Sequence, residues 1–320
     1  MMTYSLSLDG GGSKLAALLF DENGVPVSYA TAAGVNPRFT DAASVAEHIR
    51  DCFRRLFEGF PPLRLKHVLY ASVLEDTTLY RQALSPYAVC DEWVALGEGR
   101  LGLLACGIYP SGTLVLSGTG SDTFFIKDGK QLEMIGGHGA LISDAGSGYA
   151  IGKAALEAAL RASEGWGPPT LLTEEVCRQA GLHEIHEAIP YVYRSPAPVR
   201  TIAALTRCVG AAARRDDPVA LRILEQAGRV LAEQAQAMFR RHPEAASLPL
   251  AVIGGGFRTH PLLFESFCRS MQPHPVQRPL FEPVAGGMVY EAYLRHGSLS
   301  SRELQALQSA FAALDKTQAH

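Results

Sequence analysis

A short run of small and polar residues near the start of the chain has the composition of a phosphate-binding turn. The residues D-G-G-G-S (9–13) separate the alternating stretch S-L-S-L (5–8) from the continuous apolar run L-A-A-L-L-F (15–20). Alternation and short apolar runs are typical of strands, so the three glycines are expected to form the turn between two strands. A hairpin needs only one or two such residues, whereas three glycines leave backbone N–H groups accessible, and phosphate oxygens are their usual ligand. A flexible hairpin tip is the alternative.

The second half of the chain repeats this pattern. The turn S-G-T-G-S (117–121) lies between two expected strands (113–117 and 122–127), and a tight turn and a third strand follow, as they do at the opening. Two similar α/β domains that each offer a phosphate-binding turn to a shared cleft are the most economical explanation, and they weaken the hairpin-tip alternative. A third glycine-rich turn, at 254–257, follows an apolar strand at 248–253.

The elements between these turns indicate an α/β architecture. An amphipathic helix is expected over 40–59, because its apolar residues fall on one face and glycine and prolines follow it. Strands are expected at 67–72 and 87–90, with a helix over 92–105. The remainder is mainly helical and includes a long amphipathic stretch at 218–241.

Composition narrows the classes of partner. The 320 residues carry a net charge of -3 without a block of like charge, which argues against nucleic acid and membrane partners and favours small molecules. The N-terminus resembles no signal peptide and no apolar run approaches a membrane span, so a cytoplasmic location is expected. The six cysteines lie far apart without a C-x-x-C pair, which disfavours a zinc site or a disulfide framework.

Four motifs together resemble the actin, hexokinase and heat-shock-chaperone ATPase superfamily, in particular its N-acetylglucosamine kinase and BadF/BadG/BcrA/BcrD-type ATPase branch. They are D-G-G-G-S (9–13), S-G-T-G-S (117–121), G-G-H-G-A-L-I-S-D-A-G-S-G-Y (136–149) and A-V-I-G-G-G-F (251–257). The resemblance covers nearly the whole chain, and S-D-A-G-S-G is its most specific part. It implies two ribonuclease-H-like α/β domains with an ATP cleft between them: an N-terminal domain at 1–112, and a C-terminal domain at 113–320 with helical insertions and a C-terminal helix.

The resemblance implies that the first two turns hold the phosphates of ATP from opposite domains and that the last turn binds adenosine. The expected nucleotide-binding residues are Gly10, Gly11, Gly12, Ser13, Gly118, Thr119, Gly120, Gly255 and Gly256. Asp9 is placed to hold a water molecule of ATP-bound Mg²⁺, since hard oxygen ligands suit that ion, or else it caps the turn. Lys14 does not have the spacing of a P-loop lysine, and a lysine after a turn is usually solvated.

The resemblance also implies a base for the acceptor hydroxyl. Asp91, in C-D-E-W-V-A-L-G, resembles the aspartate of the family segment N-D-x-x-x-A-x-x-G, which accepts the proton of the sugar hydroxyl. It is expected directly after the strand at 87–90. A weak base suffices, because phosphoryl transfer passes through a loose transition state. A helix N-cap is the alternative for Asp91, and neighbouring Glu92 competes for the role of base.

The other expected sugar contacts are Asn36, Ser121, Gly137, His138, Gly139 and Asp144. Asn36 also fits an ordinary turn before Pro37, whereas Asp144 among glycines and serines is hard to explain as a surface charge. Cys90, His138, Ala145 and the segment V-L-E-D (73–76) depart from the family pattern around the acceptor pocket. These departures leave the identity of the sugar open.

The expected activity is therefore ATP-dependent, magnesium-dependent phosphorylation of the 6-hydroxyl of an amino sugar, N-acetylglucosamine or glucosamine, by a monomer or a homodimer. One alternative is an ATPase that activates a 2-hydroxyacyl-CoA dehydratase or reductase, but the isolated cysteines do not suggest its iron–sulfur cluster. Another is a non-catalytic sugar sensor, which intact Asp9, Asp91 and Asp144 disfavour. The stretch H-E-I-H (183–186) could suggest a metal, but two histidines without further ligands are more often a polar surface.

Overall fold

The computed structural model describes residues 3–38 and 40–318, which form two compact units. Unit 1 comprises Met1–Ser111, Ile126–Lys130 and Pro279–His320, and unit 2 comprises Gly112–Phe125 and Gln131–Arg278. The predicted second domain, 113–320, thus differs from unit 2 at residues 126–130 and at its end, both of which belong to unit 1. The C-terminal segment packs in unit 1, where the Leu280 and Phe281 N–H groups both donate to the Ala105 carbonyl. Within the described ranges, no helix has both the length and the apolar character needed to cross a membrane.

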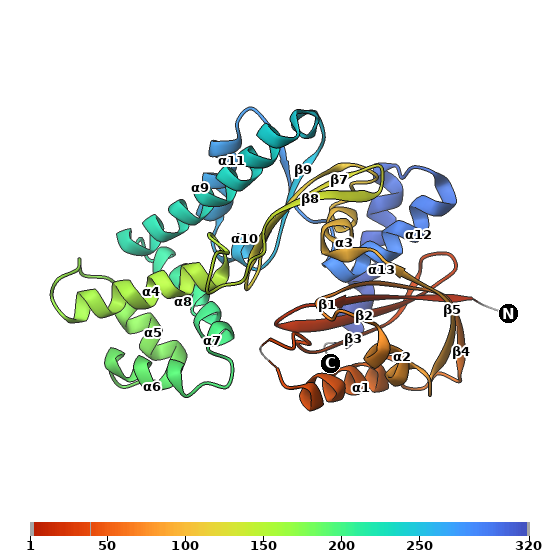
Figure 1. Ribbon diagram of the computed structural model, residues 1–320, viewed down its shortest axis with the longest axis horizontal. Coiled ribbons are helices and arrows are strands. Elements are labelled where there is room, and N and C mark those ends of the chain that lie inside the picture. Colours follow the sequence, from red (N-terminus) through yellow and green to blue (C-terminus); the bar gives the residue numbers. More distant parts are fainter. Residues whose placement is uncertain (1–2, 39, 319–320) are drawn as a thin grey trace. The chain divides into compact units, whose positions relative to one another are not determined.

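Unit 1 is built on a five-stranded sheet in the order β3-β2-β1-β4-β5 (Figure 1). The strands are β1 (Tyr4–Gly10), β2 (Lys14–Asp21), β3 (Pro26–Ala33), β4 (Leu63–Ser72) and β5 (Ala88–Ala95). The first three strands form the predicted antiparallel meander, and β1, β4 and β5 run parallel. Their register places Gly10 beside Ser72 and Tyr70 beside Ala95, so the carboxyl ends of these three strands share one edge.

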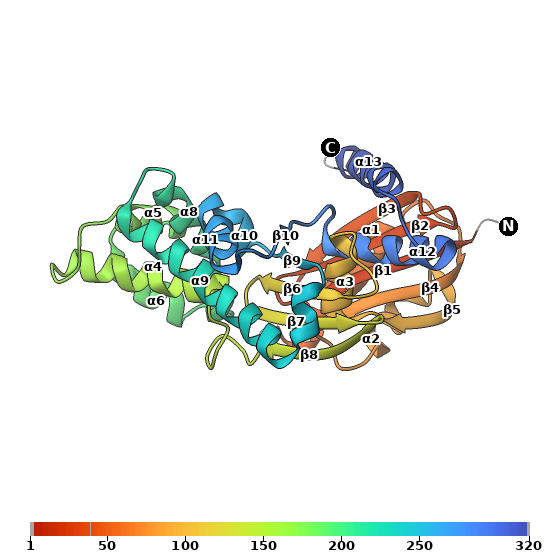
Figure 2. The same cartoon turned by 90° about the horizontal axis from the view of Figure 1, so that it is seen from above.

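Helices cover both faces of this sheet. They are α1 (Ala42–Leu56), α2 (Thr78–Leu84), α3 (Gly97–Ala105), η3 (Pro283–Ala285), α12 (Gly286–His296) and α13 (Ser301–Gln318). On β2, Leu15 and Leu19 pack in one core with α1, whereas Leu18 and Phe20 pack in a second core with α3, α12 and α13. Figure 2 shows α13 beside β3. Burial on both faces explains why β2 reads as a continuous apolar run rather than an alternating one.

Unit 2 has its own five-stranded sheet in the order β10-β9-β6-β7-β8. The strands are β6 (Gly112–Ser117), β7 (Ser121–Lys127), β8 (Lys130–Gly136), β9 (Leu250–Ile253) and β10 (Val276–Gln277). Strand β9 is parallel to both of its neighbours, β6 and β10. The turn at 117–121 therefore joins β6 to β7, as predicted from the sequence.

Helices supply most of unit 2. They are α4 (Gly148–Ser163), α5 (Leu172–Ala180), η1 (Ile185–Glu187), α6 (Ala188–Tyr193), α7 (Pro198–Ala204), α8 (Thr206–Ala213), α9 (Pro218–Arg241), η2 (Pro243–Ser247), α10 (Gly256–Thr259) and α11 (Pro261–Met271). The long helix predicted over 218–241 is confirmed as α9, and the Asp217 side chain caps it by accepting from the Val219 and Ala220 N–H groups. Its buried face joins a core that includes Val115 and Val252 of the sheet.

Candidate functional site

The first glycine-rich turn lies at the carboxyl edge of the unit 1 sheet. The Gly11 N–H donates to the Lys14 carbonyl over 2.9 Å, and the Gly11 carbonyl accepts from the Val35 N–H over 3.0 Å. These two bonds close the turn and attach it to the segment after β3. Ser13 is exposed at its tip.

The three glycines of this turn differ in whether the structure has room for a Cβ atom. A Cβ atom on Gly10 would collide with the Tyr80 hydroxyl, so packing requires glycine there. A Cβ on Gly11 or Gly12 would have its nearest neighbour at 3.5 or 3.7 Å, and neither residue has the left-handed backbone that favours glycine. Neither packing nor conformation explains glycine at these two positions. Both positions would allow a ligand to approach the backbone closely, which is the role that the sequence predicts for them.

Asp9 lies beside this turn on β1 and is partly buried. Burial raises the pKa of its carboxyl group to about 6; the Lys14 ammonium acts in the opposite direction, and the Glu282 carboxylate raises it further. A carboxylate held in a site that penalises its charge gains from a nearby cation. The position therefore fits the predicted role of holding a water molecule of nucleotide-bound Mg²⁺, a cation that protein sites bind through few carboxylates.

Asn36 lies in a turn close to the first glycine-rich turn. Its Oδ1 accepts from the Arg38 N–H over 2.9 Å, which is the ordinary turn. Its Nδ2 lies 3.7 Å from the position that a Cβ on Gly12 would take. The turn thus holds the Asn36 amide group beside the first glycine-rich turn.

Asp91 is not where the sequence reading expected it. Strand β5 continues through it to Ala95, so Asp91 neither follows a strand nor caps a helix. It lies four residues before Ala95, roughly 13 Å from the carboxyl edge, given the rise per residue of a strand. Its Oδ1 lies 2.8 Å from Arg64 Nη2 in an exposed ion pair. The predicted strand end at residue 90 is wrong because β5 is an edge strand, where solvent-facing charges are tolerated in the strand interior.

Another carboxylate, Glu98, stands at the carboxyl edge itself, and the sequence reading did not single it out. It lies in the first turn of α3, three residues beyond the end of β5. Arg100 secures the connection, since its Nε donates to the Leu96 carbonyl over 2.6 Å and its Nη1 to the Gly129 carbonyl over 2.9 Å. The stretch G-E-G, with Gly97 at φ +73°, was the available signal for a turn that presents an acidic side chain.

The second glycine-rich turn is tied to the loop 136–147 of unit 2. The Ser117 hydroxyl donates to the Gly146 carbonyl over 2.8 Å, and the Ser121 hydroxyl donates to the Ala145 carbonyl over 2.9 Å. A Cβ on Gly120 would lie 2.7 Å from Asp144 Oδ2. The structure therefore brings the predicted contacts Ser121 and Asp144 together. The backbone of this turn also meets the start of α4, since the Gly118 and Thr119 carbonyls accept from the N–H groups of Gly148 (2.8 Å) and Tyr149 (3.3 Å).

Asp144 is buried within this loop. It is 5% exposed and adopts φ 61°, a left-handed conformation that aspartate tolerates better than most residues. Its Oδ1 accepts from the Gly139 N–H over 3.2 Å. Gly139 itself has φ +95°, so this loop needs glycine for its conformation. The prediction that Asp144 is not an ordinary surface charge is confirmed.

A second carboxylate, Asp122, lies beside Asp144 and was missed by the sequence reading. Burial and then the Asp144 charge raise the pKa of Asp122 to about 6, while His138 acts in the opposite direction. A Cβ on Gly137 would collide with Asp122 Oδ1. The predicted residues Gly137 and His138 thus gather around Asp122. The available signal was its position directly after Ser121, on a strand that leaves a glycine-rich turn.

The third glycine-rich turn follows β9. A Cβ on Gly254 or Gly256 would collide with Ser117, with its carbonyl oxygen or its hydroxyl, respectively. A Cβ on Gly255 would meet nothing within 4 Å, and Gly255 lacks left-handed backbone. Packing therefore explains Gly254 and Gly256; Gly256, which the sequence predicts to face adenosine, is buried against Ser117, whereas Gly255 is exposed.

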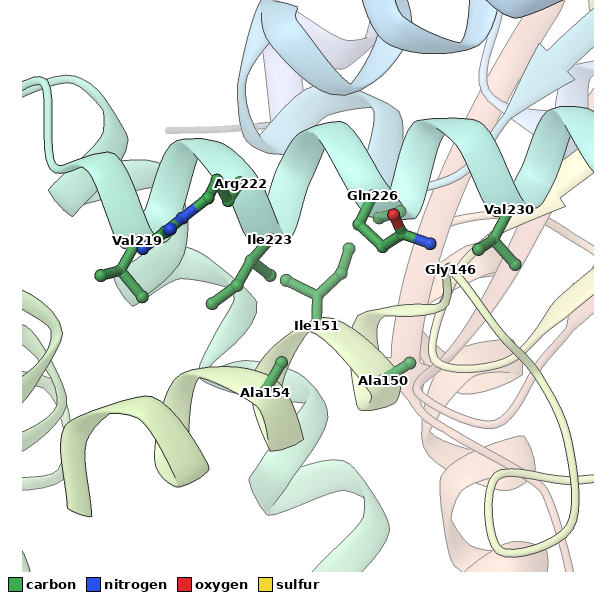
Figure 3. Close-up of a pocket in the computed structure, with 10 residues that line it drawn as sticks. Gly146, Ala150, Ile151, Ala154, Val219, Arg222, Ile223, Gln226 and Val230 are labelled. Carbon is green, nitrogen blue, oxygen red and sulfur yellow. The ribbon is translucent and has the colours of Figure 1, made fainter. Parts of the chain in front are cut away.

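A separate cavity of about 330 Å³ lies in unit 2 between α4 and α9 (Figure 3). Ile151 and Ile223 face each other across it, and Arg222 and Gln226 are its polar residues. It contains none of the residues predicted to bind nucleotide or sugar. Among the described residues, no group of three His, Cys, Asp or Glu side chains is arranged to hold a metal ion, the H-E-I-H stretch included.

Comparison with known proteins identifies relatives. The profile of the BadF/BadG/BcrA/BcrD ATPase family matches residues 6–286. The N-acetylmuramic acid/N-acetylglucosamine kinase of Clostridium acetobutylicum is 27% identical over 242 residues, which cover 72% of this chain and 77% of that protein. The glucosamine kinase GspK of Vibrio cholerae is 25% identical and covers 70% of this chain and 76% of its own. A proposed N-acetylglucosamine kinase structure from Chromobacterium violaceum superposes with a TM-score of 0.70 at 23% identity, over 90% of this chain and 98% of that one, and shows the same fold.

Proposed function

The chain belongs to the BadF/BadG/BcrA/BcrD ATPase family, and from this premise we propose that it phosphorylates an amino sugar at the expense of ATP. The acceptor is N-acetylglucosamine or glucosamine, and the γ-phosphoryl group goes to its 6-hydroxyl. The observation that carries the proposal is the grouping, in unit 2, of Asp144 and Ser121 against the glycine-rich turn at 117–121. Kinases of amino sugars among the relatives support it.

The nucleotide is assigned to the three glycine-rich turns. In unit 1, Gly11, Gly12 and exposed Ser13 offer backbone and hydroxyl groups to phosphate oxygens. In unit 2, the turn Gly118–Gly120 binds phosphate, and Gly255 contacts adenosine. Asp9 holds a water molecule of the bound Mg²⁺, and that ion neutralises negative charge on the phosphates.

The sugar is assigned to a polar set of groups. Asp144 and Asp122 accept hydrogen bonds from sugar hydroxyls, because carboxylates bind such groups strongly. Ser121, Gly137, His138 and Gly139 complete the unit 2 contribution. In unit 1, the Asn36 amide group donates to a sugar hydroxyl.

We assign the proton acceptor to Glu98 rather than Asp91. Glu98 shares the carboxyl edge of the unit 1 sheet with Asp9 and the first glycine-rich turn, whereas Asp91 lies back along β5 in an ion pair with Arg64. A carboxylate of ordinary basicity is adequate, since in a loose transition state the hydroxyl loses its proton late. The position of Glu98 at the carboxyl edge of the sheet is therefore the reason to prefer it to Asp91 as the proton acceptor.

Coupled ADP release across a panel of sugars tests this function. Glucosamine, N-acetylglucosamine, N-acetylmuramic acid and the neutral hexoses are compared at equal concentration, with 6-deoxy-N-acetylglucosamine as the matched control. We expect ADP release with at least one amino sugar and none above background with the 6-deoxy analogue, which lacks the accepting oxygen. If every sugar left ADP release at background, the kinase assignment would be wrong.

A further inference from the structure

A polar cluster beside the first glycine-rich turn includes a residue from the far end of the chain. Lys14 Nζ lies 2.7 Å from Glu282 Oε2, although 268 residues separate them. The Tyr29 hydroxyl donates to the same carboxylate oxygen over 3.0 Å. We call these three residues, with neighbouring Asp9, the Lys14 cluster. All four belong to unit 1.

Lys14, Glu282 and Tyr29 are each fixed by the element to which they belong or by packing. Lys14 begins β2, and its carbonyl accepts the Gly11 N–H, so its backbone is part of the turn. Glu282 directly precedes η3, whose Val284 is fully buried in the core. Tyr29 packs edge-on against Phe311, with ring centroids 5.9 Å apart. The sequence predicts a solvated Lys14 side chain. In the structure, this side chain is instead paired with Glu282.

Stability does not account for this arrangement. The side chains of Lys14 and Glu282 are 44% and 38% exposed, and an ion pair at such exposure contributes little to folding. The pair does act on Asp9, because Lys14 lowers and Glu282 raises the pKa of that carboxyl group. The ammonium group therefore stands within electrostatic reach of the residue assigned to the magnesium ion, at the turn assigned to phosphate.

We propose that Lys14 is a ligand of the ATP phosphates and that Glu282 is the positioning residue that holds its ammonium group at the turn. An ammonium group has three N–H donors, and Glu282 engages one of them, so Lys14 can donate to a phosphate oxygen while it stays in place. Positioning matters because a free lysine side chain loses considerable rotamer freedom when it is immobilised by a ligand. This inference rests on the proposed function only through ATP binding, and not on the identity of the sugar.

A second ion pair supplies a matched control. Lys153 Nζ and Glu157 Oε1 lie 2.8 Å apart on α4, with side chains 56% and 49% exposed. The pair has the same chemistry as Lys14 and Glu282 but touches no glycine-rich turn. Changes there report the general effect of removing a surface charge.

Calorimetric titration of Mg²⁺–ATP into the full-length protein without sugar tests the proposal. The variants are Lys14→Met, Lys14→Arg, Glu282→Met and the double variant Lys14→Met/Glu282→Met, with Lys153→Met as the control. A melting curve of each variant checks that it is folded. We expect Lys14→Met to weaken ATP binding about tenfold or more, the usual scale of a charge-assisted hydrogen bond, while Lys14→Arg keeps most of the affinity and Lys153→Met is unchanged.

The test of positioning is the effect of Lys14→Met measured in two backgrounds. With Glu282 replaced by Met, we expect it to shrink to about threefold or less, because an unheld lysine contributes less to binding. If Lys14→Met leaves the affinity of a folded protein unchanged, Lys14 is not a phosphate ligand. If its effect is as large or larger without Glu282, Glu282 does not position it. Absence of ATP binding by the unmodified protein would instead overturn the proposed function.

Discussion

The two glycine-rich turns at 9–13 and 117–121 look alike in sequence but differ in what their glycines accommodate. In unit 1, a Cβ on Gly11 or Gly12 would meet neighbours only at ordinary contact distance, and the charged side chains of Lys14 and Glu282 lie beside the turn. In unit 2, Gly120 makes room for the Asp144 carboxylate, and serine hydroxyls bind the turn to a neighbouring loop. Packing therefore leaves Gly11 and Gly12 of the first turn unexplained, whereas Gly120 of the second turn makes room for a buried carboxylate. The same motif thus leaves two glycines without a packing role in one unit and uses one glycine for internal packing in the other.

Removing the proposed base at the edge of unit 1 has the largest expected effect. Glu98→Gln keeps the size of the side chain but cannot accept a proton, so kcat should fall about 100-fold or more, while ATP and sugar still bind. Asp91→Asn is the matched control, because its side chain lies well back along β5 and bonds Arg64. Steady-state kinetics of both variants, with binding measured by calorimetry, check this. Equal turnover by Glu98→Gln and the unmodified protein, with a large loss in Asp91→Asn, would restore the role to Asp91.

Adding one methyl group to each turn tests the comparison directly. Gly11→Ala should weaken Mg²⁺–ATP binding about tenfold, because the new Cβ occupies the approach of a phosphate oxygen. Its melting temperature should stay level or rise slightly, since alanine restricts the unfolded chain and meets no atom closer than 3.5 Å.

The corresponding change in unit 2, Gly120→Ala, should behave in the opposite way. Its Cβ would lie 2.7 Å from Asp144 Oδ2, so we expect a loss of stability of about 1–3 kcal/mol and a raised KM for the sugar. Calorimetry and thermal melts of the two variants give the result. Unchanged ATP affinity in folded Gly11→Ala would mean that no ligand approaches the backbone at Gly11 and that the first turn is only a connection between strands.

The free energy of unfolding should depend on pH through the Asp122 carboxyl group of unit 2. Asp122 has a folded pKa of about 6 against 3.8 for the unperturbed group, so the folded state binds the proton more tightly. The stability contributed by protonation is therefore present below pH 4 and is lost as the pH rises through 6. Asp122→Asn should raise the free energy of unfolding at pH 7 by about 1–3 kcal/mol, and the gain should vanish near pH 4. Denaturant titrations at both pH values measure it, and a gain that is independent of pH would contradict the assignment.

The smallest expected effect is the pH dependence of Mg²⁺–ATP affinity that Asp9 of unit 1 causes. Asp9 has a pKa of about 6, so its charged form is lost as the pH falls below that value. Mg²⁺–ATP affinity should weaken a few-fold between pH 7.5 and pH 5.5, beyond the change that titration of ATP itself causes, because only the carboxylate holds the water molecules of the metal ion. Asp9→Asn should bind more weakly at pH 7.5 and show only the nucleotide's own pH dependence. An identical pH profile in both proteins would remove Asp9 from the metal site.

Local patterns were sufficient for much of the fold. The meander of β1 to β3, the helix α1 and the long helix α9 follow from alternation, helical periodicity and capping residues, which act within a few residues of the chain. The same holds for the glycine-rich turns. The strand β5 was misjudged because its charged interior, C-D-E-W, reads as a strand end, and its true extent depends on pairing with β4. Because of that error, Asp91 was expected at the carboxyl edge of the sheet, whereas it lies in the middle of β5.

The sequence by itself determined the two strand–turn–strand patterns, the position of Asp144 in a glycine-rich loop and the candidate phosphate turns, because these depend on residue types at short spacing. The tertiary structure alone decided that Glu98 shares an edge with Asp9 and that Asp122 lies partly buried beside Asp144. It also decided that Glu282 reaches Lys14 across 268 residues. Strand register, burial and long-range ion pairs arise only when distant segments pack, and they raise the pKa of Asp9 and Asp122 and bring Glu282 to Lys14.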